Sequence, residues 1–188
     1  MPKVIDDSKI FKTVIEMFVS RGYEGTTTKE IAELANINEA TLFRKYGSKA
    51  GLFEKAIRHQ LSDTPLNTLV FTGDLETDLR AIVNAYLETN QLHGEIIPSL
   101  LAELPRRPEL RGATMILFEN IQAAAKIIQA YQLRGDLKTE SPMSSLNDLI
   151  GPLMTKQMFR RASMDFPTIE IEPHEHVRNF LNGRKSQV

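Results

Sequence analysis

The chain has 188 residues, of which 41% are hydrophobic and 25% are charged, and its formal net charge is -1. This composition is typical of a globular protein, and the near-neutral charge gives no indication of a nucleic-acid partner. The chain contains no cysteine, which excludes disulfides, thiolate metal ligands and thiol-based redox sensing.

No apolar run approaches the ~18 residues that are needed to cross a bilayer. Residues 1–7 also lack the apolar core of a signal peptide. We therefore expect a cytoplasmic protein with no membrane partner, no cofactor and no metal site. Apolar residues recur at helical rather than alternating spacing, which predicts an all-α fold of about nine helices in total.

The first predicted helix carries an apolar stripe from Ile10 to Phe18 and ends at Gly22, which suits a C-terminal cap. Thr27 and Glu30 then have the spacing of a capping box, in which the hydroxyl accepts a backbone N–H and the carboxylate reaches back. This pair predicts the start of a second, short helix.

The second helix has three apolar positions, Ile31, Leu34 and Ala35. Asn36 suits a turn with positive φ, and Asn38 suits the N-cap of a third helix over 39–46. Leu42 and Tyr46 are spaced to face inward on that helix. Two short helices at a fixed angle are typical of a helix-turn-helix motif, in which one helix enters a DNA major groove.

A fourth helix is expected after Ser48, with apolar positions from Leu52 to Ile57. The helical period then fails over 62–74, where Pro and Gly punctuate the sequence. This break predicts two domains: a helix-turn-helix domain with its connecting helix over 1–61, and a second helical domain over 62–188.

Further amphipathic helices are expected in the second domain. The apolar period places them at 75–86, 95–104, 109–133, 146–162 and 173–181, with a loop at Asp165–Glu172. The stretch 109–133 is apolar on several faces, which is typical of the middle of a bundle.

Residues 9–61 resemble the DNA-binding domain of the TetR family of bacterial transcriptional regulators. The matching motifs are Arg21-Gly22-Tyr23, Thr26-Thr27-Thr28, Ile31-Ala32-x-x-Ala35, Thr41-Leu42-Phe43-Arg44-Lys45-Tyr46 and Ser48-Lys49-x-x-Leu52. The Ile150-Gly151-Pro152-Leu153-Met154 segment and the final helix are similar to the last two helices of that family. The resemblance implies a homodimer on double-stranded DNA, controlled by an unidentified small-molecule effector in the larger domain.

The expected DNA contacts follow from the predicted helix-turn-helix frame. Residues at the start of the recognition helix can reach base edges. Helix N-termini and basic side chains can contact the phosphates. Glu39 could accept a hydrogen bond from cytosine or could instead cap its own helix. The resemblance implies a phosphate role for Lys49 and a lost phosphate contact at Phe43, where family members often have Tyr. The candidate residues are Thr28, Glu39, Ala40, Thr41, Phe43, Arg44, Lys45 and Lys49.

Apolar and polar residues of the second domain could line an effector cavity, although most are expected to be core. The candidates are Tyr86, Leu100, Glu103, Leu104, Phe118, Ile121, Gln122, Met154 and Met158. The last two helices could pair with their symmetry copies as a four-helix bundle. Their candidate interface residues are Leu149, Leu153, Gln157, Val177, Phe180 and Leu181.

The function expected from the sequence is a ligand-responsive transcriptional repressor that binds an inverted repeat. The alternative is a helical interaction protein of the same fold with weak or non-specific DNA binding. An enzyme is not expected, because the four histidines are scattered and the sequence has no nucleophile elbow, P-loop, zinc-protease motif or dinucleotide fingerprint. No catalytic residue is therefore assigned.

Overall fold

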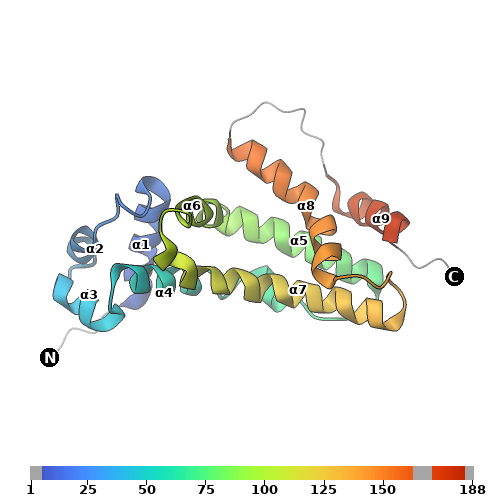
Figure 1. Ribbon diagram of the computed structural model, residues 1–188, viewed down its shortest axis with the longest axis horizontal. Helices are drawn as coiled ribbons and strands as arrows, with labels where there is room; N and C mark the ends of the chain where they lie inside the picture. Colours follow the sequence, from blue (N-terminus) through green and yellow to red (C-terminus); the bar gives the residue numbers. More distant parts are fainter. Residues whose placement is uncertain (1–5, 163–170, 185–188) are drawn as a thin grey trace. The chain divides into compact units, whose positions relative to one another are not determined.

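The computed structural model describes residues 6–162 and 171–184, and in this part the chain is all-α, as expected (Figure 1). The elements are α1 (Asp7–Arg21), α2 (Thr28–Ala35), α3 (Glu39–Tyr46), α4 (Lys49–Leu61), η1 (Pro65–Thr68), α5 (Leu75–His93), α6 (Ile96–Glu103), η2 (Pro108–Thr114), α7 (Met115–Arg134), α8 (Pro142–Arg161) and α9 (Pro173–Arg184). The elements named η are 3-10 helices.

Side-chain caps begin the first helices where the sequence indicates them. Thr27, Asn38 and Ser48 each accept a backbone N–H of the helix that follows, which confirms these three N-caps. The capping box of α2 differs from its expected form, because the Glu30 carboxylate accepts a hydrogen bond from the Thr27 hydroxyl at 2.9 Å. Gly22 ends α1 with a φ of 72°, a conformation that favours glycine.

The chain divides into two compact units. Unit 1 comprises residues 1–63 and 92–118, and unit 2 comprises 64–91 and 119–188. The first expected domain, 1–61, therefore lies within unit 1, but residues 92–118 belong to that unit as well. The reason is packing, because Ile96, Leu100 and Leu110 share one buried core with α1 and α4.

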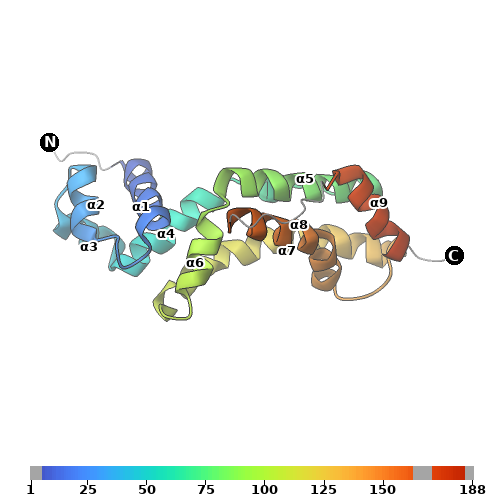
Figure 2. The same ribbon diagram turned by 90° about the horizontal axis from the view of Figure 1, so that it is seen from above.

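Unit 2 is built on the two long helices α5 and α7, which share a core with α8 and α9 (Figure 2). Leu79, Ile82 and Val83 of α5 are fully buried, as are Ile128 and Tyr131 of α7. These buried residues follow the helical period of apolar residues that is visible in the sequence.

The starts of two elements differ from the sequence-based expectation. The stretch expected to be one helix from residue 109 begins as η2 and becomes α-helical at Met115. Helix α8 begins four residues before the expected start, because Ser141 caps it and Pro142 occupies the first turn. Of the expected loop Asp165–Glu172, residues 165–170 lie outside the described residues.

Leu34 is a correction to the expected apolar face of α2. Its side chain is 58% exposed, whereas Ile31 is fully buried. An eight-residue helix buries one narrow stripe against its neighbours, and Leu34 falls outside that stripe.

Candidate nucleic-acid interface

The turn between α2 and α3 sets the angle of the candidate recognition helix. Asn36 adopts the left-handed conformation with φ 56° and ψ 47°, as expected. The Ile37 N–H donates to the Ala32 carbonyl at 2.9 Å, and the Asn38 side chain accepts the Ala40 N–H at 2.8 Å. These bonds satisfy backbone groups at both sides of the turn, so the start of α3 is held at a defined place.

Helix α3 has a buried face and an outward face. Leu42 and Tyr46 are 2% and 7% exposed, and the Tyr46 ring packs against Phe11 of α1. Ala40 and Arg44 are exposed, and Phe43 is 45% exposed. The outward face therefore presents one small, one aromatic and one cationic side chain, a combination that suits base edges and phosphates.

Glu39 is bonded to Thr28 across the helix-turn-helix motif. The Thr28 hydroxyl donates to Glu39 Oε1 at 2.6 Å, and both side chains are half-buried. Asn38 supplies the side-chain N-cap of α3, and Glu39 lies in the first turn of that helix, where the helix dipole favours a carboxylate. Thr28, expected to meet a phosphate, uses its hydroxyl proton inside the protein.

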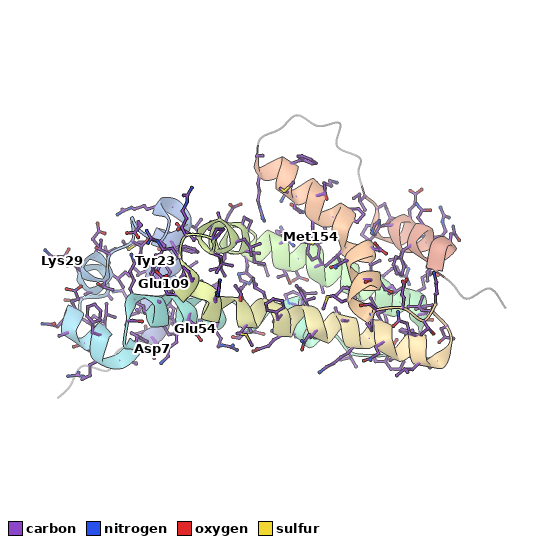
Figure 3. All side chains as sticks on the ribbon, viewed as in Figure 1. Asp7, Tyr23, Lys29, Glu54, Glu109 and Met154 are labelled. Carbon is purple, nitrogen blue, oxygen red and sulfur yellow. The ribbon has the colours of Figure 1, made fainter. Side chains whose placement is uncertain are left out.

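Lys45 forms an ion pair with Asp7. Asp7 is the first residue of α1 and is labelled in Figure 3. The Tyr46 hydroxyl donates to the same Asp7 oxygen at 2.8 Å. Burial alone would raise the pKa of Asp7, but the hydrogen bonds from Lys45 and Tyr46 and the charge of Lys45 lower it below its ordinary value. Burial and the Asp7 contact raise the pKa of Tyr46. Asp7 therefore stays ionised, and the charge of Lys45 is partly neutralised before any DNA arrives.

Lys49 lies over an aromatic ring. Its Nζ is 4.2 Å from the centroid of the Tyr23 ring, a cation–π distance. Burial lowers the pKa of Lys49, and the nearby carboxylate of Glu24 opposes that shift. Lys49 is thus a partly desolvated cation that lies over the Tyr23 ring at the first turn of α4.

The turn after α1 is tied to the α6–η2 segment of the same unit. Glu103 Oε1 accepts the Tyr23 N–H at 3.0 Å, and Arg107 pairs with Glu24. Burial and the charges of Glu109 and Glu24 raise the pKa of Tyr23. These contacts link α6 to the segment that leads into the helix-turn-helix motif. A shift of α6 would therefore move or break the contacts of that segment.

The candidate effector residues do not come from one unit. Leu100, Glu103, Leu104 and Phe118 belong to unit 1, where Leu100 is core and Glu103 holds Tyr23. The other five belong to unit 2 and are Tyr86, Ile121, Gln122, Met154 and Met158.

Within unit 2 the five remaining candidates differ in their surroundings. Tyr86 and Ile121 pack on the core, whereas Met154 and Met158 are 49% and 60% exposed. Gln122 lines a shallow surface depression together with Ala125, Lys126, Gln129, Ser141, Pro142 and Met143. Glu103 is a correction to the effector set, because its carboxylate already serves the turn after α1.

Most candidate interface residues lie in the core of their own chain. Leu149, Leu153, Val177 and Phe180 are each at most 7% exposed and pack in unit 2. The periodicity correctly marks them as buried, but it does not say whether the covering surface is the same chain or a second copy. They are therefore a correction to the expected interface, whereas Gln157 and Leu181 are half-buried.

Three further residues of this candidate interface were not predicted from the sequence. Asp7 and Tyr23 act through contacts that are distant in sequence, so no local signal marks them. Lys29 is exposed in the first turn of α2, where a cation opposes the helix dipole (Figure 3). That unfavourable placement is a signal that could have added Lys29 to the candidate phosphate contacts.

In the described part of the chain, no three His, Asp or Glu side chains come together in a way that could hold a metal ion. Within the same ranges, every helix is too short or too polar to cross a membrane.

A capped two-helix motif with an outward recognition helix, joined to a helical second unit, defines a helix-turn-helix DNA-binding protein. Residues 10–56 match the model of the bacterial regulatory proteins of the tetR family, and residues 71–170 match a tetracyclin repressor-like C-terminal domain. The chain therefore belongs to the TetR family of bacterial transcriptional regulators.

Relatives with known names are transcriptional regulators too. The HTH-type transcriptional regulator YvkB of Bacillus subtilis (strain 168) is 37% identical over 91 residues, a match that covers 48% of this chain and 48% of that protein. The HTH-type transcriptional regulator BetI of Paraburkholderia xenovorans (strain LB400) is 32% identical over 162 residues, covering 69% of this chain and 83% of that protein. These names confirm the expectation of a regulator rather than an enzyme.

Solved structures of regulators share the fold. The flavonoid-responsive regulator FrrA superimposes with a TM-score of 0.76 at 18% identity, covering 97% of this chain and 98% of that one. The TetR family transcription regulator SCO0332 gives a TM-score of 0.66 at 19% identity, covering 94% and 96%. At these identities the likeness establishes the fold alone.

Proposed function

We propose that this chain is a transcriptional repressor that binds an inverted-repeat DNA operator as a homodimer and is released by a small molecule. The observation that carries the proposal is the α2–turn–α3 frame. There the buried Leu42 and Tyr46 anchor α3 while Ala40 and Arg44 face outward. Since bacterial DNA lies in the cytoplasm, the proposal also places the protein there.

The proposed DNA contacts fall into two groups. The start of α3, with Ala40 and the half-buried Thr41, meets base edges in the major groove. The cationic side chains contact the phosphates on either side of the major groove, and Phe43 packs against the sugar-phosphate backbone of the DNA. This second group is Lys29, Arg44, Lys45 and Lys49.

The proposed dimer contact is the outward face of α8. Met154 and Met158 lie four residues apart and therefore on one face of that helix, and both are about half exposed. Pairing of this face with its symmetry copy removes two large apolar side chains per chain from water. The two recognition helices then reach half-sites that are about one helical turn apart.

The proposed effector site lies in unit 2, near Tyr86 and Ile121. Helices α5 and α7 each have residues in both units, because the unit boundaries fall inside them. A ligand that favours one arrangement of these helices would also act on α6 and, through Glu103, on the turn after α1. A coupling of ~1–3 kcal/mol would change DNA affinity about five- to 150-fold.

A second candidate function is an interaction protein that binds DNA weakly. The observation in its favour is that Lys45 already pairs with Asp7 and Lys49 already lies over Tyr23. Both cations would have to change partners or share them before they could attract phosphates. Salt dependence separates the two functions, since a specific binder keeps its sequence preference as salt rises.

The test is selection from randomised duplex DNA with the purified chain at near-physiological salt. The repressor proposal expects an enriched inverted repeat and a complex of two chains per duplex. Arg44→Ala should weaken binding to all sequences, whereas Arg106→Ala, which removes an exposed charge from the loop before η2, should not. A failure to enrich any repeat would reject the repressor in favour of the interaction protein.

A further inference from the structure

Two residues of the helix-turn-helix motif, eleven apart in sequence, form one hydrogen-bonded unit. The Thr28 hydroxyl donates to Glu39 Oε1 at 2.6 Å, a length typical of a charge-assisted O–H···O bond. Thr28 is the first residue of α2 and Glu39 the first residue of α3. The bond therefore joins the beginnings of the two helices that would approach DNA.

We propose that Glu39 is a specificity-determining residue that selects a cytosine in each half-site, and that Thr28 is the positioning residue that aims its carboxylate. This inference rests on the proposed function, because it requires a sequence-specific operator. It assigns Thr28 a different role from the phosphate contact expected from its place at a helix start.

The Glu39 carboxylate has an acceptor that is not used within the described part of the chain. An ionised carboxylate can only accept hydrogen bonds, and it has two oxygens. Thr28 donates to Oε1, Asn38 supplies the N-cap of α3, and no described residue donates to Oε2. One acceptor is therefore left for a donor from outside the chain.

Glu39 also lies at the end of α3 that would approach the bases. The N-terminal residues of a recognition helix contact base edges, and Glu39 is followed directly by the exposed Ala40. Glu39 is half-buried, and the bond to Thr28 restricts its rotamers. An acceptor held in this way loses little conformational freedom when it meets a base.

The four bases differ in the donors and acceptors that they would present to this carboxylate. In the major groove, cytosine presents an amino donor, guanine presents two acceptors, and thymine presents an acceptor and a methyl group. Adenine has an amino group, but it lies beside an acceptor nitrogen that would repel a second carboxylate oxygen. Cytosine is the base that a single fixed acceptor suits, and phosphates are excluded because they carry the same charge as Glu39.

The experiment compares operators selected by the wild type and by four variants. The wild type should select a cytosine at one position of each half-site, and replacing that base should weaken binding at least about fivefold per half-site. Glu39→Gln should abolish this preference and favour a base with an acceptor at that edge, because the Gln oxygen can stay on Thr28 while its amide donates. Glu33→Gln removes the same charge from an exposed position of α2 and should leave the preference unchanged.

Thr28→Val and Thr28→Ser separate positioning from phosphate binding. Loss of a phosphate contact weakens all sequences alike, whereas loss of positioning lowers the ratio between the cytosine operator and its substituted form. Thr28→Val should reduce that ratio to below about twofold, compared with the wild-type difference of about fivefold or more. Thr28→Ser should restore the ratio, and thermal unfolding of each variant reports whether the fold is retained.

The outcomes distinguish this inference from the proposed function. If the wild type selects no inverted repeat, the proposed function itself fails. If a repeat is selected but Glu39→Gln selects the same bases at every position, the repressor stands and the role of Glu39 is rejected. If Thr28→Val weakens all sequences equally, Thr28 is a phosphate contact and its positioning role is rejected.

Discussion

The Tyr131 hydroxyl donates a hydrogen bond to Oδ2 of Asp78 at 2.5 Å, which joins α7 to α5 inside unit 2. The same carboxylate accepts from the Thr72 backbone N–H at 2.9 Å and from the Thr72 hydroxyl at 2.6 Å. Asp78 is 1% exposed, so its charge depends on these donors. One buried carboxylate thereby fixes the segment before α5 against both long helices.

Tyr131→Phe is expected to destabilise the protein by about 1.5–3 kcal/mol, the range for a hydrogen bond to a charged group. The ring keeps its packing, and Asp78 keeps its two donors from Thr72, so the protein should still fold. The measurement is urea unfolding at pH 7, followed by circular dichroism. Tyr86→Phe is the control, because Asn90 and Arg161 rather than a carboxylate act on that hydroxyl. Equal losses in both variants would contradict a special role for the Asp78 contact.

The Tyr131→Phe loss is expected to shrink in acid. Burial would raise the pKa of Asp78, but the hydrogen bonds from Thr72 and Tyr131 lower it below its ordinary value. A lowered pKa means that the ionised carboxylate stabilises the fold above about pH 4 and that this stabilisation is lost as the pH falls through the folded-state pKa. Urea midpoints at pH 6 and pH 3 test this. If the difference in urea midpoint between wild type and variant is as large at pH 3 as at pH 6, the prediction is wrong.

Asp7→Asn is expected to strengthen DNA binding. It frees Lys45 for a phosphate, so affinity should rise and the slope of log K against log salt should steepen by about 0.9. Tyr46 keeps an acceptor in the Asn side chain. Asp6→Asn is the matched control, since it removes the same charge one residue away and can still cap α1. If both variants raise affinity alike, the effect is general charge removal and not release of Lys45.

Glu103→Ala is expected to weaken both stability and DNA binding. It removes the acceptor of the Tyr23 N–H and leaves that buried donor unpaired, at a cost of about 1–3 kcal/mol. Glu103→Gln keeps a side-chain oxygen at the same distance and should behave nearly as wild type. The measurements are thermal unfolding and titration of a selected operator. Equal effects of Ala and Gln would show that charge, not the hydrogen bond, is what the turn needs.

Met154→Lys is expected to dissociate the proposed dimer. A lysine on the outward face of α8 would have to be buried against its own symmetry copy, and two like charges would meet there (Figure 3). Gln91→Lys adds the same charge to an exposed position of α5 and should leave the dimer intact. Sedimentation equilibrium gives the mass directly. A dimer that survives Met154→Lys would place the interface elsewhere.

The local features of the motif could be predicted because their signals are local. Asn36 has a positive φ, and Asn38 and Ser48 cap their helices, because short polar side chains at those positions satisfy nearby backbone groups. The start of α8 after the Ser141 N-cap was not predicted, because the apolar period begins only further along the chain.

The contacts between distant segments could not be predicted. The Lys45–Asp7 pair joins residues 38 apart, and the Glu103–Tyr23 bond joins residues 80 apart. Charged residues are common on helices, and nothing in their spacing tells which two will meet once the chain has folded. The burial of Leu149 and Val177 within one chain is a similar case, since an apolar stripe specifies burial but not the covering surface.

The pairing of Lys45 with Asp7 bears on how the protein would search a chromosome. A free lysine binds any stretch of DNA it encounters, and each such encounter delays arrival at the operator. With Asp7 already beside the ammonium, an encounter with unrelated DNA gains less, so residence there is shorter. At the proposed operator, base contacts that other sequences lack would offset the cost of moving Lys45 from Asp7 to a phosphate. An intramolecular ion pair of this kind would lower the affinity for all DNA sequences and would shorten the search for the operator.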